Sequence, residues 1–334
     1  MKAPRKRKPT CVVIGDAAGI GPEITVKALF DSSLYHASHP ILIGDPEVVE
    51  QALRITKINM EVRPIASLSE ARIQYPVLNI FDLGTPKLQG ISMGKISSIS
   101  GQAFVRWFQK AIEMTDTGEL GAIVYAPLNK EAIHAAGYPF RDEVDMIDAF
   151  TSAPTPYLLV VSIAGRYRSA SIPPLHISLR QACECINTET IFNSIILLHE
   201  GLKRFGIDNP VIGVVGLNPH GGESGLHGDE EIRFIQPAVQ VAWQKGIDAR
   251  GPFPPDTVFV KAKAGEFDCV LGMYHDQTRI AMKLLRFKKI IYTTLGTSLN
   301  FVSVAHGTAY DIAGKGIADP DNFKQALRYG ARVR

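Results

Sequence analysis

The sequence has little net charge, few cysteines and no long apolar run. Its 334 residues carry 36 basic and 33 acidic side chains, so the formal net charge is only +3. A balance this even argues against a general nucleic-acid-binding protein. No apolar run approaches the length that crosses a bilayer, so we expect no membrane partner either. What remains is a globular protein, and its length allows two domains or one large one.

Cysteine spacing excludes a common type of metal site. The four cysteines, Cys11, Cys183, Cys185 and Cys269, do not form the two close pairs of a structural zinc site. We therefore expect reduced thiols and a cytoplasmic protein. Basic residues cluster in residues 2–8, but no apolar core follows them. This segment is expected to be a frayed terminus and not a secretory signal.

Short apolar runs alternate with segments of helical periodicity along the chain. The runs expected as strands are 11–14, 40–45, 77–81, 122–125, 157–163, 167–172, 211–215, 268–271 and 290–295. The proline-rich loop 251–259 is expected to run into a further strand, and the charged segment 138–156 is expected to be a hinge. This alternation predicts an α/β fold with mostly parallel sheets.

A glycine-rich turn follows the first expected strand, and two interpretations of it stay open. Residues 15–23 read Gly-Asp-Ala-Ala-Gly-Ile-Gly-Pro-Glu and lead into a helix. Backbone amides in such a turn can bind an anion at the start of the helix. The spacing, however, matches neither the dinucleotide fingerprint nor a P-loop. A purely structural tight turn explains the glycines equally well.

Three histidines share one context, since His176, His220 and His275 each follow an expected strand beside glycine or proline. Three imidazoles with an open position suit zinc or another divalent metal, although unrelated surface histidines are the alternative. Asp256 and Asp276 are candidates for orienting the imidazoles. Lys130, after the strand at 122–125, is a candidate clamp for a substrate or a carboxylate.

Several motifs occur in the order typical of one family. They are residues 15–23, Gly216-Leu217-Asn218-Pro219-His220, Pro254-Pro255-Asp256-Thr257, His275-Asp276-Gln277 and His306-Gly307-Thr308-Ala309. The chain resembles the PdxA family, the 4-hydroxythreonine-4-phosphate dehydrogenases of pyridoxal phosphate synthesis and their relatives. The resemblance runs from Gly15 nearly to the C-terminus.

The resemblance implies two α/β/α domains around a cleft, similar to the isocitrate and isopropylmalate dehydrogenases. We place the first domain at residues 1–137 plus 296–334 and the second at 138–295. A homodimer is implied as well, with the active site shared across the subunit interface. The implied metal ligands are His176, His220 and His275. The metal would be zinc, or manganese, magnesium or cobalt.

The implied reaction is oxidation of a secondary alcohol beta to a carboxylate, with decarboxylation, using NAD or NADP. Lys283 matches the family's substrate-binding lysine. The cofactor is expected near Gly216, Asn218, Gly221, Glu223, His306 and Asp311. Lys130, Asp256 and Asp276 are the catalytic candidates. The general base stays open among Lys130, Asp256 and a metal-bound hydroxide.

The chain departs from the family pattern where the substrate binds. Arg141 and Asp142 stand where the family has histidine and threonine. Tyr292 stands where the family has asparagine, and Phe301 stands at about the position of a family arginine. Losing that arginine removes an anion clamp, which Arg141, Arg279 or Arg286 could replace. The small hydroxy acid substrate is therefore either a phosphate ester or a cis-dihydrodiol carboxylate of the terephthalate type. An acyl transferase similar to phosphate acetyltransferases is the alternative from another class, ahead of a non-catalytic binding protein.

Overall fold

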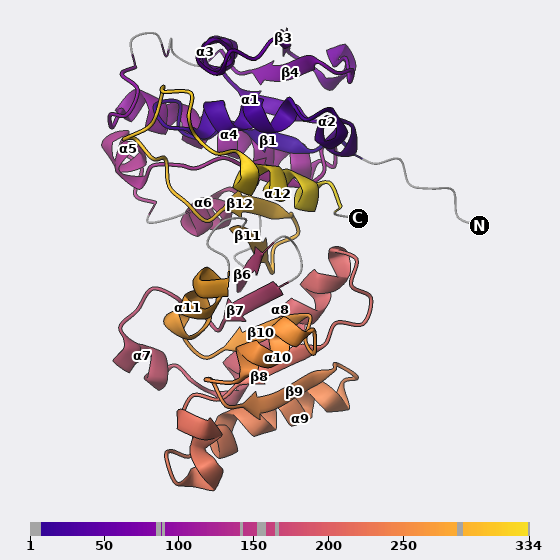
Figure 1. Cartoon of the computed structure of the whole chain (residues 1–334), viewed down its shortest axis with the longest axis vertical. Coiled ribbons are helices and arrows are strands. Elements are labelled where there is room, and N and C mark those ends of the chain that lie inside the picture. Colours follow the sequence, from indigo (N-terminus) through magenta and orange to yellow (C-terminus); the bar gives the residue numbers. More distant parts are fainter. Residues whose placement is uncertain are drawn as a thin grey trace, which may run out of the picture. The chain divides into compact units, whose positions relative to one another are not determined.

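The computed structural model describes residues 8–84, 88, 91–140, 143–151, 158–163, 167–285 and 290–332. The chain divides into two compact units (Figure 1): unit 1 comprises residues 1–155 and 298–333, and unit 2 comprises residues 156–297. The units change at 155/156 and 297/298, whereas the sequence placed domain boundaries near 138 and 295. The prediction that the two halves are separate domains is not tested by this division and stays a prediction.

Unit 1 is built on a parallel sheet with the strand order β3-β4-β2-β1-β5-β12. These strands are β3 (Glu61–Ile65), β4 (Val77–Asp82), β2 (Ile41–Gly44), β1 (Cys11–Val13), β5 (Ile123–Tyr125) and β12 (Phe301–Val304). The sequence did not predict β3 or β12. In β3 only one of five residues is buried and Pro64 is present, as suits an edge strand.

The helices of unit 1 include two that the sequence did not predict. They are α1 (Gly21–Leu29), α2 (Ser32–Ser38), α3 (Pro46–Thr56), α4 (Ser98–Asp116), α5 (Lys130–Ala135), α6 (Glu143–Phe150) and α12 (Asp321–Gly330), with a short 3₁₀ turn at Leu68–Glu70. The missed helices are α2 and α6. Helix α6 occupies part of the expected hinge at 138–156 and buries Val144, Met146 and Ile147, while the boundary between the units falls at the end of that segment, so the hinge stays a prediction.

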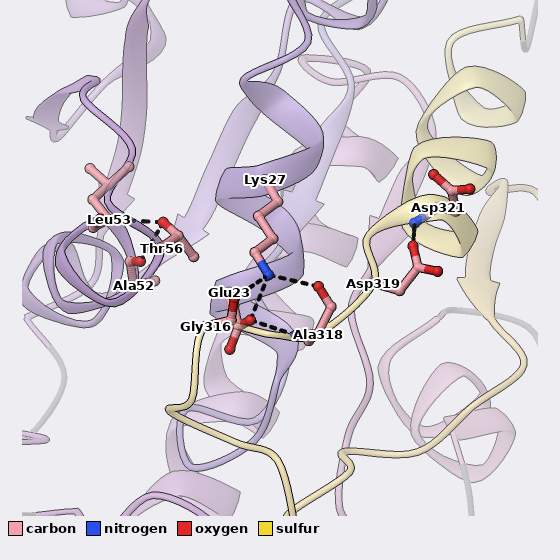
Figure 2. A network of polar contacts seen from close by, with 9 residues as sticks. All are labelled: Glu23, Lys27, Ala52, Leu53, Thr56, Gly316, Ala318, Asp319 and Asp321. Carbon is pink, nitrogen blue, oxygen red and sulfur yellow. Dashed lines mark hydrogen bonds and ion pairs between the residues drawn. The ribbon is translucent and has the colours of Figure 1, made fainter.

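Aromatic packing and one lysine tie distant parts of unit 1 together. Phe108 of α4 packs against Phe301 of β12, with ring centroids 5.9 Å apart. Figure 2 shows Lys27 of α1 donating hydrogen bonds to Glu23 Oε1, Gly316 O and Ala318 O at 2.7–2.9 Å. The Ala318 amide donates back to Glu23 Oε1 at 2.8 Å. The segment before α12 is thereby fixed to α1.

Unit 2 has a mixed sheet with the strand order β11-β6-β7-β10-β8-β9. Its strands are β11 (Ile290–Leu295), β6 (Leu158–Ile163), β7 (Tyr167–Ser171), β10 (Cys269–Gly272), β8 (Ile212–Val215) and β9 (Ala249–Phe253). β6 is antiparallel to both β11 and β7, whereas β7, β10, β8 and β9 run parallel. The expected α/β class is thus confirmed.

The helices of unit 2 are α7 (Leu179–Glu184), α8 (Thr188–Arg204), α9 (Gln236–Gln244), α10 (Val258–Ala264) and α11 (His275–Leu285), with a 3₁₀ segment at Pro219–Gly225 and a π-helical turn at Glu231–Ile235. The expectation that loop 251–259 runs into a strand was wrong. The strand β9 comes first and Val258 begins a helix, which buries Val258 against Val215, Phe267 and Val270.

The four cysteines are all free thiols. Burial raises the pKa of the Cys269 thiol to about 12, so this thiol stays protonated and unreactive at neutral pH. Among the described residues, no helix combines the length and the apolar character that a membrane span requires.

Candidate active site

The three predicted histidines follow neighbouring parallel strands of unit 2. His176 comes after β7, His220 after β8, and His275 opens α11 directly beyond β10. β10 pairs in parallel with β7 on one side and with β8 on the other. The carboxyl ends of parallel strands meet at one sheet edge, which is where open α/β sheets bind ligands. The strand order of unit 2 therefore gathers the three histidine-bearing segments.

Side-chain hydrogen bonds hold these strand ends together. Gln277 accepts a bond from the Met273 amide at 2.7 Å and donates to the carbonyl oxygen of Gly216 at 2.8 Å, so it joins the ends of β10 and β8. Ser171, at the end of β7, donates to Tyr274 O at 2.9 Å. Its hydroxyl also lies 2.7 Å from that of Thr278. These bonds fix the start of α11 relative to both neighbouring strands.

His176 and His275 lie against each other. Their ring centroids are 5.5 Å apart and the rings are tilted by 52°. Nδ1 of His275 is 2.7 Å from Oδ1 of Asp276, so the carboxylate orients the imidazole from that side. A histidine held at Nδ1 in this way presents Nε2 to an ion, as metal-bound histidines commonly do.

His220 has different neighbours. Its Nδ1 is 2.8 Å from Oε1 of Glu223, and its ring centroid is 6.2 Å from that of His227. Within the described ranges, the group of three metal-type side chains whose donor atoms lie within 4.8 Å of one another is His220, Glu223 and His227. The predicted set of His176, His220 and His275 therefore stays a prediction, with two of its members in contact.

The side chains at this sheet edge suit a divalent transition metal. Imidazole is a favoured ligand of zinc and of other first-row divalent ions. Two of the histidines carry a carboxylate at Nδ1, Glu223 on His220 and Asp276 on His275. Partners of this kind fix the ring orientation and raise the basicity of the ligand nitrogen. In this geometry Asp276 orients the ring of His275 and Glu223 orients the ring of His220.

The loop between β8 and α9 is organised around a buried carboxylate. Glu231 is 2% exposed and accepts hydrogen bonds from Asn218 N at 2.8 Å and from Asn218 Nδ2 at 2.9 Å. Glu231 was not singled out in the sequence analysis. No local sequence signal separates a buried carboxylate from the exposed acids beside it, so this role was missed.

The glycine-rich turn of unit 1 is structural. The amides of residues 16–20 donate in order to Pro127 O, Ser100 Oγ, Asp16 Oδ1, Asp16 O and Thr308 O. Asp16 is 2% exposed and also accepts bonds from the hydroxyls of Ser100 and Tyr310. Because each of these amides has a partner within the turn or its surroundings, an anion would have to displace one of them. Of the two open interpretations, the tight turn is the one that the structure supports.

The geometry at the ends of β7, β8 and β10 can now be set against known proteins. The family model described as "Pyridoxal phosphate biosynthetic protein PdxA" matches residues 36–330. The chain belongs to the PdxA family.

Two similar proteins bear the names of phosphate-ester dehydrogenases. The D-threonate 4-phosphate dehydrogenase of Cupriavidus necator is 40% identical over 324 residues, which cover 96% of either protein. The crystal structure of a 4-hydroxythreonine-4-phosphate dehydrogenase from Burkholderia phymatum is 36% identical with a TM-score of 0.87, and the alignment covers 98% of this chain and 99% of that one.

A more distant relative bears on the alternative substrate. The terephthalate 1,2-cis-dihydrodiol dehydrogenase of Burkholderia xenovorans is 26% identical with a TM-score of 0.69, over 95% of this chain and 96% of that one. The chain is thus more similar to the phosphate-ester enzymes than to this dihydrodiol enzyme.

The positions where this chain departs from the PdxA pattern differ in burial. Phe301, at about the place of the family's arginine, is fully buried in β12. Tyr292 lies on β11, and the Arg279 guanidinium sits 5.7 Å from the centre of its ring. Arg141 and Asp142 lie outside the described residues. Position 301 therefore contributes to the core of unit 1 instead of to anion binding.

Helix α11 carries the predicted substrate lysine. Lys283 is exposed and lies eight residues after His275, about two helical turns further along. Arg279, between them, is 3% exposed, and burial lowers the pKa of its guanidinium to about 10. Arg279 remains charged at neutral pH but faces Tyr292, so the structure does not support it as a replacement clamp. Arg286, another candidate for that role, lies outside the described residues.

The remaining catalytic and cofactor candidates are distributed over both units. Asp256 is exposed in the turn before α10, and Lys130 is exposed at the start of α5, where Asn129 caps the helix. The predicted cofactor contacts are Gly216, Asn218, Gly221 and Glu223 in unit 2 and His306 and Asp311 in unit 1. The Asn218 side chain is bound to Glu230 and Glu231, so it shapes the loop. These assignments stay predictions.

Proposed function

We propose that the chain is an NAD(P)- and divalent-metal-dependent dehydrogenase that oxidises a secondary alcohol beta to a carboxylate, with decarboxylation. The observation that carries the proposal is the parallel pairing of β10 with β7 and β8, which places the segments after these three strands, and with them His176, His220 and His275, at one sheet edge in a member of the PdxA family. The acyl-transferase and non-catalytic alternatives give way to it, because the relatives reported above are named as dehydrogenases.

The chain's own residues prepare the site for this reaction. A bound divalent ion would supply Lewis-acid polarisation of the alcohol, and a bound nicotinamide would supply the acceptor for the hydride. Asp276 keeps Nδ1 of His275 engaged and so directs Nε2 toward the ligand side. Gln277 holds the start of α11 against the end of β8. Proton removal is assigned to Lys130 or Asp256, the exposed candidates for a general base.

The substrate class that we propose is a four-carbon hydroxy acid phosphate, of the D-threonate or 4-hydroxythreonine type. Its support is the 40% identity with the D-threonate 4-phosphate dehydrogenase of Cupriavidus necator along almost the whole chain. Phe301 is buried, so a different cation must bind the phosphate. Lys283 is an exposed lysine on α11 that suits this role, and Arg141 is the second candidate.

One observation favours a second candidate substrate, a cis-dihydrodiol carboxylate. Two of the positions that differ from the family pattern are aromatic, the buried Phe301 and the half-buried Tyr292. The relative from Burkholderia xenovorans acts, by its name, on a dihydrodiol of this kind. A ring-bearing substrate needs no phosphate clamp, which fits the loss of the arginine.

The remaining parts of the proposal concern the setting of the reaction. We propose zinc, manganese, magnesium or cobalt as the metal and a homodimer as the working form, with the active site shared between subunits. A cytoplasmic location is proposed on the free state of the four cysteines. NAD and NADP remain alternatives.

A NAD(P)H-formation assay tests the proposal. Purified protein with added zinc or manganese is supplied with D-threonate 4-phosphate, 4-phosphohydroxy-L-threonine or the terephthalate dihydrodiol. We expect turnover of a phosphate ester that a chelator abolishes. Turnover of the dihydrodiol alone would select the second candidate. No reduction of NAD or NADP with any of the three would contradict the proposed function.

The lysine assignment has its own test. Lys283→Ala should lower kcat/KM for the phosphate ester by about 10- to 100-fold, since a hydrogen bond to a charged group contributes about 1.5–3 kcal/mol. Lys263→Ala changes an exposed lysine on α10 and is the matched control. Equal activity of the two variants would remove Lys283 from the substrate site.

A further inference from the structure

The loop after β8 contains a second histidine that neither the family resemblance nor the sequence motifs assign. His227 lies four residues after Glu223 and seven after His220. One donor atom from each of these three side chains lies within 4.8 Å of the other two. We call His220, Glu223 and His227 the loop triad. All three residues come from one short segment of unit 2.

Glu223 sits between the two imidazoles of the loop triad. Its Oε1 is 2.8 Å from His220 Nδ1, and its Oε2 is 3.5 Å from His227 Nε2. The side chains of His220, Glu223 and His227 are 62%, 47% and 42% exposed. An ion can therefore reach all three side chains from solvent.

The backbone holds the loop triad in an uncommon conformation. Residues 220–224 all have positive φ, including the non-glycine residues His220 (55°), Glu223 (42°) and Ser224 (59°). Each such residue costs on the order of 1 kcal/mol and persists only where the surroundings enforce it. Backbone strain of this kind clusters at ligand clamps and active sites.

The enforcing contacts come from beneath the loop. Glu231 binds Asn218 at the start of the loop, and a Cβ atom at Gly222 would lie 2.7 Å from Glu231 Oε2. The Gly216 amide is bonded to Phe253 O at 2.8 Å, which anchors the loop to β9. The loop triad is thus preorganised by residues that are not part of it.

We propose that the loop triad binds a divalent transition metal ion by itself. Two imidazoles and one carboxylate form a ligand set that zinc accepts at three positions, with a fourth left for water or substrate. Magnesium and calcium prefer oxygen ligands throughout, so they fit this set poorly. The proposal goes beyond the proposed function, because the loop triad requires neither His176 nor His275. His220 belongs to both ligand sets, so occupancy of one set affects the other.

Metal binding by a full-length variant without the other histidines tests this proposal. The variant carries His176→Asn and His275→Asn, both at exposed or half-buried positions. It is titrated with Co²⁺ alone, and the visible absorption of the bound ion is recorded. We expect one Co²⁺ per subunit. Adding His227→Asn should weaken binding at least about tenfold, since even an outer partner of a metal ligand is typically worth 10- to 100-fold.

His36→Asn in the same background is the matched control, because His36 is an exposed histidine of unit 1. It should leave the Co²⁺ affinity unchanged. Absence of Co²⁺ binding in the double variant would overturn the proposal. So would an affinity that His227→Asn does not alter.

A second measurement avoids the double variant in case it does not fold. The unmodified protein is treated with diethyl pyrocarbonate with and without Zn²⁺, and modified histidines are located by mass spectrometry. Zn²⁺ should protect His227 and leave the labelling of His36 unchanged. Equal labelling of His227 in both samples would overturn the proposal, and this readout is independent of dehydrogenase activity.

Discussion

Two glycine-rich connections of this chain join a parallel strand to a helix, yet they do different things. In the turn at residues 15–21 of unit 1, the amides of residues 16–20 and the Asp16 carboxylate point inward, and each has a hydrogen-bond partner. The loop at residues 216–228 in unit 2 buries Glu231 beneath it and leaves His220, Glu223 and His227 exposed to solvent. The first connection is a structural joint, and the second is a platform for side chains.

The difference shows what a glycine-rich loop does and does not indicate. In both loops glycine is required where a Cβ would collide: at Gly21 it would lie 2.4 Å from Ile14 O, and at Gly222 it would lie 2.7 Å from Glu231 Oε2. Glycine therefore reports close packing of the backbone in both places. Function depends on which side chains the tight backbone leaves on the outside.

The largest expected effect concerns the inward-facing turn. Asp16→Ala removes the acceptor of the Ala18 amide and of the Ser100 and Tyr310 hydroxyls. Because buried donors left unpaired cost about 1–3 kcal/mol each, we expect the free energy of unfolding to fall by about 4 kcal/mol. Urea denaturation measures it. Asp116→Ala, at an exposed end of α4, is the control and should change stability little. A similarly small loss for Asp16→Ala would mean that the turn is not a structural joint.

The next effect concerns the support under the outward-facing loop. Glu231→Gln keeps the size of the side chain but turns one acceptor of the Asn218 bonds into a donor. We expect a loss of about 3 kcal/mol in stability together with weaker Co²⁺ binding by the loop triad. Glu230→Gln is the neighbouring control, because Glu230 accepts a hydrogen bond from the side-chain amide of Asn218, whereas the backbone amide of Asn218 donates to Glu231. Equal effects of the two substitutions would show that burial of Glu231 does not organise the loop.

The sequence predicted most of the fold because strand and helix periodicities are local. The prediction failed where the hydrophobic pattern is weak or where burial depends on residues far away in the sequence. β3 has one buried residue in five, and β12 is a four-residue run whose burial depends on α4 and α12. The proline-rich segment 251–259 was expected to run into a strand. Tertiary packing of Val258 decided in favour of a helix instead.

The candidate site was predictable to a lesser degree. His176, His220 and His275 could be identified because each follows a strand, and strand order then brings the segments together. The contacts that position them could not be predicted. Gln277 reaches a carbonyl 61 residues away in the chain, and Glu231 is distinguished from Glu230 only by its burial. His227 carried a signal, the His-x2-Glu-x3-His spacing, which the family motifs did not draw attention to.

A smaller effect is expected for the carboxylate of Asp276, which orients His275. Asp276→Asn removes the charge that orients His275 and should weaken binding of Zn²⁺ at the predicted site by about 10- to 100-fold. Competition with a chromophoric chelator measures the affinity, and Asp208→Asn, an exposed residue of unit 2, is the control. Unchanged affinity in Asp276→Asn would indicate that the ring of His275 is oriented by the backbone of α11 alone.

The smallest expected effect concerns Tyr310, and it shows whether the turn at residues 15–21 depends on the neutral form of this tyrosine. Burial, together with the hydrogen bond to Asp16, raises the pKa of Tyr310. A tyrosine whose pKa is higher in the folded state ionises first in the unfolded chain. Its contribution to stability is complete below the unfolded pKa of about 10 and is lost as the pH rises above it.

Tyr310→Phe should lower the free energy of unfolding by about 1 kcal/mol at pH 7. It should also reduce the fall in stability above pH 10, without abolishing it, because burial raises the pKa of Tyr35 to about 12 as well. Urea midpoints from pH 7 to 11 give both quantities. If wild type and Tyr310→Phe lost stability in parallel over that range, the tyrosine would not be coupled to the turn, and Asp16 would hold the joint through Ser100 and the Ala18 amide.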